Sequence, residues 1–142
     1  MPEVNWLAVL VCGVASMVLG SLWYGPLFGK MWMEMTGFNN MDPARREEMK
    51  KGMVRSYSLA FIGALIMAYI LSHVITYASN YNNVSGVSAG LSSAFWMWLG
   101  FIVPSSMGMV LWEGKPWKYW FLNASYYLIQ LLVFGLILGS WR

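Results

Sequence analysis

Residues 54–77 read VRSYSLAFIGALIMAYILSHVITY, an apolar run in which Arg55 is the one charged side chain. A helix of about 20 residues crosses the hydrocarbon core of a membrane, so this run is long enough for one span. In lipid every backbone N–H and C=O needs an internal partner, and a transmembrane strand is about half this length. The run therefore predicts a membrane-spanning helix.

Three further runs have the same character, at about Val4–Tyr24, Val87–Trp112 and Trp117–Ser140. The whole chain is 58% hydrophobic and 11% charged, whereas soluble domains carry about 25% charged residues. We read the first run as a permanent helix because its head lacks positive charge and contains Glu3. The sequence thus predicts one all-α integral membrane domain, residues 1–142, with four transmembrane helices in a bundle.

Lysine and arginine predict the orientation of this bundle. Eight of the nine basic residues fall in two connections, and only Arg142 falls on the other side. Basic connections stay in the cytoplasm, so we expect both termini outside the cytoplasmic membrane. The basic side chains would then contact anionic lipid headgroups, and membrane lipids rather than nucleic acid are the expected partner.

The first connection, residues 25–53, is expected to hold a short helix in the membrane interface, because its apolar residues recur at helical spacing. Gly25-Pro26 should end the first span, since the residue before proline avoids the α region. Asp42-Pro43 should start a helix as N-cap and first residue. Aromatic rings that favour headgroup depth flank this side of the spans, namely Trp23, Tyr24, Trp32, Trp112, Trp117 and Trp120.

Methionines in the same connection raise the alternative of a thioether site for Cu(I), with Met31, Met33 and Met35 as ligands together with Met41. Alternate residues on a helix do not share one face, and methionine is common apolar filler. No histidine or cysteine lies nearby in the sequence. We therefore expect no metal site and no cofactor.

Each run also carries small residues at a spacing of about four, which lets helix backbones approach closely in lipid. The principal positions are Cys12, Ser16, Gly20, Ala60, Ala64, Ala68, Ser72, Gly135 and Gly139. Packing inside one bundle and contact between copies of the chain both explain them.

Polar side chains within the runs are the candidates for a ligand site: His73, Asn123, Ser92, Ser93, Gln130 and Tyr127. Polar groups inside spans often mark function, but they also join helices by hydrogen bonds of about 0.6 kcal/mol each. Histidine is the residue type that most often acts as a switch at physiological pH, and His73 is the one histidine in the sequence. We favour a structural, neutral role for it over ligand binding or pH sensing.

Two segments, VNWLAVLVCGVASMVLGSLWYGPLFGKMWMEM and EGKPWKYWFLNASYYLIQLL, resemble the two ends of a family of small bacterial membrane proteins. The family is known as a domain of unknown function, and its motifs here are WYGPLFGK and EGKPWK followed by NASY. The resemblance covers nearly the whole chain and implies four helices in the inner membrane, with no established activity. Asn123 lies in the second motif. Many members have histidine where this chain has Tyr127, so a role of that histidine does not carry over.

Three functions follow from these features. The chain has no nucleophile motif, phosphate loop or pair of carboxylates within its spans, so an enzyme is the least favoured. The favoured hypothesis is a module that acts through helix association, with itself or as an accessory subunit of a larger membrane complex. The alternative is binding or transport of a small apolar or cationic molecule between the helices, because the aromatic third run could supply cation–π surfaces.

Overall fold

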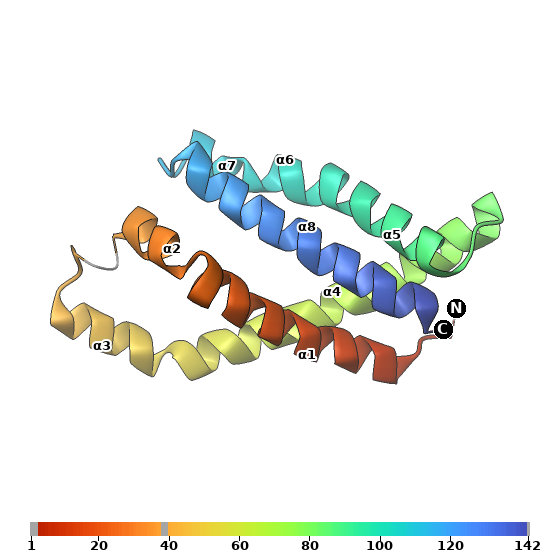
Figure 1. Cartoon of the computed structure of the whole chain (residues 1–142), viewed down its shortest axis with the longest axis horizontal. Coiled ribbons are helices and arrows are strands. Elements are labelled where there is room, and N and C mark those ends of the chain that lie inside the picture. Colours follow the sequence, from red (N-terminus) through yellow and green to blue (C-terminus); the bar gives the residue numbers. More distant parts are fainter. Residues whose placement is uncertain (1–2, 38–39, 142) are drawn as a thin grey trace.

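The computed structural model describes residues 3–37 and 40–141, and over these residues it is helical without a strand. Four helical stretches are long and apolar enough to cross a membrane: Trp6–Leu27, Met53–Asn82, Gly86–Leu111 and Trp117–Ser140. Figure 1 shows them side by side in an elongated bundle. The all-α prediction with four membrane-length helices is confirmed.

The first stretch consists of α1 (Trp6–Leu22) and a π-helical turn, η1 (Trp23–Leu27). The connection holds α2 (Gly29–Thr36) and α3 (Pro43–Lys51), and α4 (Met53–Asn82) follows. The third stretch is broken into α5 (Gly86–Met97), a π-helical turn η3 (Trp98–Ile102), α6 (Val103–Ser106) and α7 (Gly108–Leu111). The last helix is α8 (Trp117–Ser140).

The start of α1 and the end of α8 lie together at one end of the bundle (Figure 1). Asn5 joins them, because its Oδ1 accepts from the Ala8 N–H at 3.1 Å and its Nδ2 donates to the Trp141 carbonyl at 3.2 Å. Both ends of the described chain therefore lie on one side of the bundle. The side of the membrane that they face stays a prediction, and Arg142, used in the charge argument, lies outside the described residues.

The connection between the first two spans begins one turn later than Gly25-Pro26 predicts, so that prediction is wrong. Pro26 lies inside η1, and the Phe28 N–H donates to the Trp23 carbonyl at 2.9 Å, five residues back. A π-helical turn widens the backbone ladder, and proline, which has no N–H to donate, falls where the ladder changes register. The Asp42-Pro43 prediction is confirmed, since Asp42 accepts from the Ala44 N–H at 3.3 Å and Pro43 is the first residue of α3.

The core is built on close backbone contact between α5 and α8. A methyl group added to Gly90 would lie 2.8 Å from the carbonyl carbon of Gly135, and closer still to its oxygen. One turn along, a methyl group on Gly139 would lie 2.5 Å from the Gly86 carbonyl oxygen. The glycines thus let two helix backbones touch, which is the packing that small residues permit in lipid.

The other small positions also lie largely inside the bundle. Ala64, Ala68 and Ser72 of α4 are buried, as are Cys12 and Ser16 of α1. Ala60 is exposed and Gly20 is half-buried. Large side chains fill the remaining space, with Phe134, Leu71, Ile75 and Leu138 fully buried.

Candidate functional site

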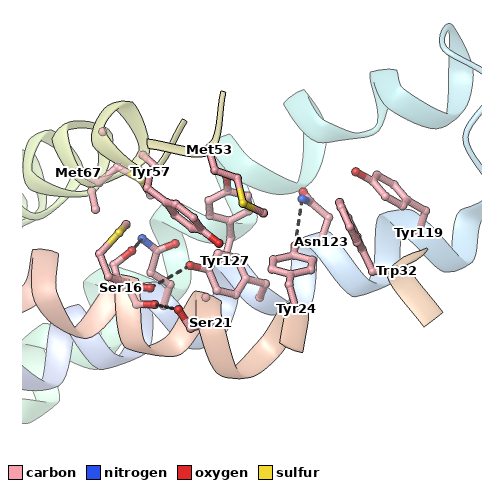
Figure 2. Close-up of a pocket in the computed structure, with 17 residues that line it drawn as sticks. Ser16, Ser21, Tyr24, Trp32, Met53, Tyr57, Met67, Tyr119, Asn123 and Tyr127 are labelled. Carbon is pink, nitrogen blue, oxygen red and sulfur yellow. Dashed lines mark hydrogen bonds between the residues drawn. The ribbon is translucent and has the colours of Figure 1, made fainter. Parts of the chain in front are cut away.

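A cavity of about 590 Å³ lies between α1, α4 and α8. Its α8 wall consists of Tyr119, Asn123, Tyr126, Tyr127 and Gln130, whose spacing of three or four places them on one helix face. Figure 2 shows side chains from the three helices converging on this space. The described residues that line it include no charged side chain.

The closed end of the cavity contains a buried amide. Gln130 and Ser16 are each 3% exposed, and the Gln130 Nε2 donates to the Ser16 hydroxyl at 2.9 Å. The other amide atom, Oε1, is buried and has no hydrogen-bond partner among the described residues. Buried polar atoms are normally paired, and an orphaned one calls for an explanation.

Tyrosine rings form the middle of the cavity. The Tyr126 hydroxyl donates to the Ser16 carbonyl at 3.3 Å, and the Tyr126 ring lies 5.3 Å from the rings of both Tyr24 and Tyr127. Gly20 makes room for this arrangement, because a methyl group there would lie 3.1 Å from the Tyr126 hydroxyl. The three rings give the cavity flat apolar surfaces with hydroxyl groups at their edges.

The opposite end of the cavity is lined by Trp32 of α2 and contains one longer hydrogen bond. Asn123 Nδ2 donates to the Tyr24 hydroxyl at 3.5 Å (Figure 2). Trp32 of α2 lies edge-on to Tyr24, with ring centres 6.3 Å apart, and also lines the cavity. The connection between the spans therefore contributes a wall to the site.

Two tryptophans hold α8 on either side of Asn123. The Trp23 indole donates to the Leu122 carbonyl at 3.3 Å, and the Trp98 indole donates to the Ala124 carbonyl at 2.8 Å. Each tryptophan is the first residue of a π-helical turn. Such turns often occur at functional sites, and here both fix the helix that carries the polar wall.

The remaining side of the cavity is apolar and open. Met53, Tyr57 and Ala60, from the first half of α4, line the cavity and are exposed, as is Ser21 near the end of α1. Figure 2 shows Met53 and Tyr57 on the α4 side, facing the tyrosines. The cavity therefore opens beside α4, and its end at Gln130 is enclosed by buried residues.

The structure separates the polar residues that the sequence marks as candidates. Asn123, Tyr127 and Gln130 line the cavity, whereas His73, Ser92 and Ser93 do not. The His73 ring instead contacts Tyr69 of the same helix edge-on, with ring centres 4.6 Å apart, and Tyr69 stacks on Trp6. Ser92 is exposed, and the Ser93 oxygen is buried with no partner among the described residues.

The aromatic residues predicted for the membrane interface also divide into two groups. Trp112 and Trp117 are exposed, as interfacial rings would be. Tyr24 and Trp32 line the cavity, Trp23 fixes α8, and the Trp120 indole donates to the Ser106 hydroxyl at 2.9 Å.

Sequence reasoning did not assign Tyr24, Tyr57 or Tyr119 to a site, and it placed Tyr24 at the membrane interface instead. The available signal was the spacing of Tyr119, Asn123, Tyr126 and Gln130, which places them on one face of a helix that has few other polar groups. Among the described residues, no cluster of three or more His, Cys, Asp or Glu side chains could hold a metal ion.

Comparison with known proteins gives a family and no relative of assigned activity. Neither the curated proteins nor the solved structures contain a match to this chain. A family model described as "Protein of unknown function (DUF1761)" matches residues 7–139. Because the match spans nearly all of the chain, the protein belongs to the DUF1761 family.

Proposed function

We propose that this protein binds one small, uncharged and largely apolar molecule within the membrane, in the cavity between α1, α4 and α8. The observation that carries the proposal is an uncharged, tyrosine-lined cavity of about 590 Å³ whose lining includes a buried amide. Ligand sites are typically concavities of about 300–1,000 Å³, mostly apolar, with a few convergent polar groups. The cavity has all of these properties.

The absence of charge from the described lining residues argues for an uncharged ligand. A charged group within a membrane is costly unless a partner of opposite charge meets it. The tyrosine rings offer cation–π surfaces, but no described carboxylate lines the cavity to complete a cation site.

The main sequence argument for helix association was the small residues of the spans, and contacts within one chain also explain them. Gly90 and Gly135 contact each other inside the bundle, and Ala64 and Ala68 are buried there. These small residues are accounted for by contacts within one chain, so they do not call for a second chain. Association with itself or with another membrane protein stays a prediction.

The proposal is tested by titrating 4-butylphenol and 4-butylanisole, two uncharged aromatic probes, into the protein in lipid nanodiscs. Isothermal titration calorimetry, with empty nanodiscs subtracted, should show saturable binding of one molecule per chain. Ala60→Phe places a ring at the open side of the cavity and should weaken binding at least tenfold. Ile62→Phe, two residues away on the exposed surface of α4 and outside the cavity lining, should bind like the wild type.

Two results would contradict the proposal. One is the absence of saturable binding of either probe to the wild type. The other is unchanged binding in Ala60→Phe, because a ligand held anywhere else would not respond to a ring at that position.

A further inference from the structure

We infer that the ligand of this cavity carries a hydroxyl group on an aromatic body, and that the hydroxyl donates its hydrogen to Oε1 of Gln130. This inference rests on the proposed function and names the class of molecule that the site selects. It follows from three features of the closed end: the orphaned amide oxygen, the absence of charge and the neighbouring tyrosine rings.

The amide of Gln130 is satisfied at one end only. Its Nε2 donates to the Ser16 hydroxyl at 2.9 Å, while Oε1 has no partner among the described residues. An amide oxygen accepts hydrogen bonds and cannot donate them. The complementary group must therefore be a donor, and a ligand that brings only an acceptor would leave the oxygen unpaired.

The location of this oxygen makes the pairing selective. Gln130 lines the cavity but is only 3% exposed and its Oε1 is buried, so the amide has to turn towards the cavity for a ligand hydroxyl to reach this oxygen. A buried acceptor that stays unpaired in a complex weakens binding, and a site built to hydrogen-bond a hydroxyl rejects analogues that lack it. We expect a difference of about tenfold in the dissociation constant.

The body of the ligand is defined by the rings around the polar end. Tyr24, Tyr126 and Tyr127 present their rings to the cavity, and Met17 and Met67 line it as well. Aromatic rings prefer offset or edge-on contact with other rings, and thioethers pack well against ring edges. A phenol combines such a body with a donor and is uncharged at neutral pH.

The first test compares the two probes on the wild-type protein. 4-Butylphenol and 4-butylanisole share one body, and the methyl ether lacks the donor while being the more apolar of the two. We expect the phenol to bind about tenfold more tightly, although non-specific partition into lipid favours the ether. Equal affinity, or a preference for the ether, would overturn the inference while leaving the proposed binding function intact.

The second test assigns the preference to the amide. Gln130→Met keeps an unbranched side chain without an amide, so the phenol should lose its advantage while 4-butylanisole still binds. Ser93→Ala is the matched control, because Ser93 also has a buried oxygen without a described partner but does not line the cavity. The assignment of the phenol's advantage to Gln130 would be overturned if Ser93→Ala no longer bound the phenol more tightly than the ether. It would also be overturned if Gln130→Met still did.

A third measurement needs no substitution, because Gln130 is the only glutamine in the chain. Protein labelled with ¹³C at the glutamine side-chain carbonyl gives one signal, which reports directly on hydrogen bonding at Oε1. The phenol should shift this signal in a saturable manner, and the ether at the same occupancy should shift it far less. An unmoved signal at full occupancy of the phenol would overturn the inference even if Gln130→Met failed to fold.

Tighter binding of the quaternary ammonium analogue 4-butyl-N,N,N-trimethylanilinium than of the phenol would overturn the ligand class as well. That cation has no hydrogen to donate, so its affinity would come from the tyrosine rings alone. The phenol should bind more tightly, because the cavity has no described charged side chain to offset the desolvation of a cation.

Discussion

Replacement of Gly90 by alanine tests whether α5 and α8 touch through their backbones. The added methyl carbon would lie 2.8 Å from the carbonyl carbon of Gly135, where ordinary contact begins near 3.4 Å. The two helices must therefore move apart by at least about 0.6 Å. Because the obstructing atoms belong to the backbone of α8, no rotation of a side chain can relieve the contact.

The expected cost is at the upper end of the range for overpacked cores, about 3 kcal/mol. Alanine is also a better helix former than glycine by about 1 kcal/mol, which offsets part of this cost. We therefore expect Gly90→Ala to lower the free energy of unfolding by about 2 kcal/mol. Unfolding in mixed micelles with increasing sodium dodecyl sulfate, followed by circular dichroism, measures this change.

Gly100→Ala is the matched control in the same span. Its methyl group would meet nothing within 4 Å, so only the higher helix propensity of alanine applies. The free energy of unfolding should therefore stay the same or rise. The difference between the two variants isolates the helix contact from the helix propensity. Equal stability of Gly90→Ala and Gly100→Ala would show that α5 and α8 are not in backbone contact, and the arrangement in Figure 1 would be wrong there.

Two further predictions concern the positions of helices. Trp98→Phe removes the indole N–H that donates to a carbonyl of α8 at 2.8 Å and should lower stability in the same assay by about 1 kcal/mol. Trp96→Phe, at an exposed ring, should change it little, and equal effects would contradict the assigned bond. For the orientation, cysteines at Ala44 and Asn82, in a chain without its own cysteine, are treated with a membrane-impermeant thiol reagent in intact cells. The charge distribution predicts labelling at 82 and not at 44, and the reverse pattern would overturn the predicted orientation.

The fold could be predicted because its determinants are local. Apolar runs such as Val54–Tyr77 are long enough to span a membrane and carry almost no charge, and lipid leaves helices as the one conformation for such runs. The N-cap at Asp42 and the proline after it are equally local, and the structure has both in the expected roles. Where a prediction failed, at Gly25-Pro26, a π-helical turn changed the bonding register, which no single residue preference reveals.

The candidate site could be predicted only in part, because a cavity is a property of three helices at once. Asn123, Tyr127 and Gln130 stood out as polar groups inside a span, and they line the cavity. His73 stood out for the same reason and lies elsewhere, against Tyr69. Polarity within a span identifies residues that need partners, but the neighbours that supply those partners depend on helix rotation, which the sequence does not specify.

The two π-helical turns, η1 and η3, change the rotation of the spans that contain them. An inserted residue turns everything beyond it by about 100° around the helix axis, since each α-helical residue turns by that amount. In η1 the Trp23 indole donates to the Leu122 carbonyl and the Tyr24 hydroxyl accepts from Asn123, so the turn begins at the residues that contact α8 and rotates the residues beyond them. In η3 the same feature is paired with the bond from Trp98 to Ala124. The polar wall of α8 is thus held on both sides of Asn123 by tryptophans that begin π-helical turns, and each turn rotates the part of its span that follows this contact.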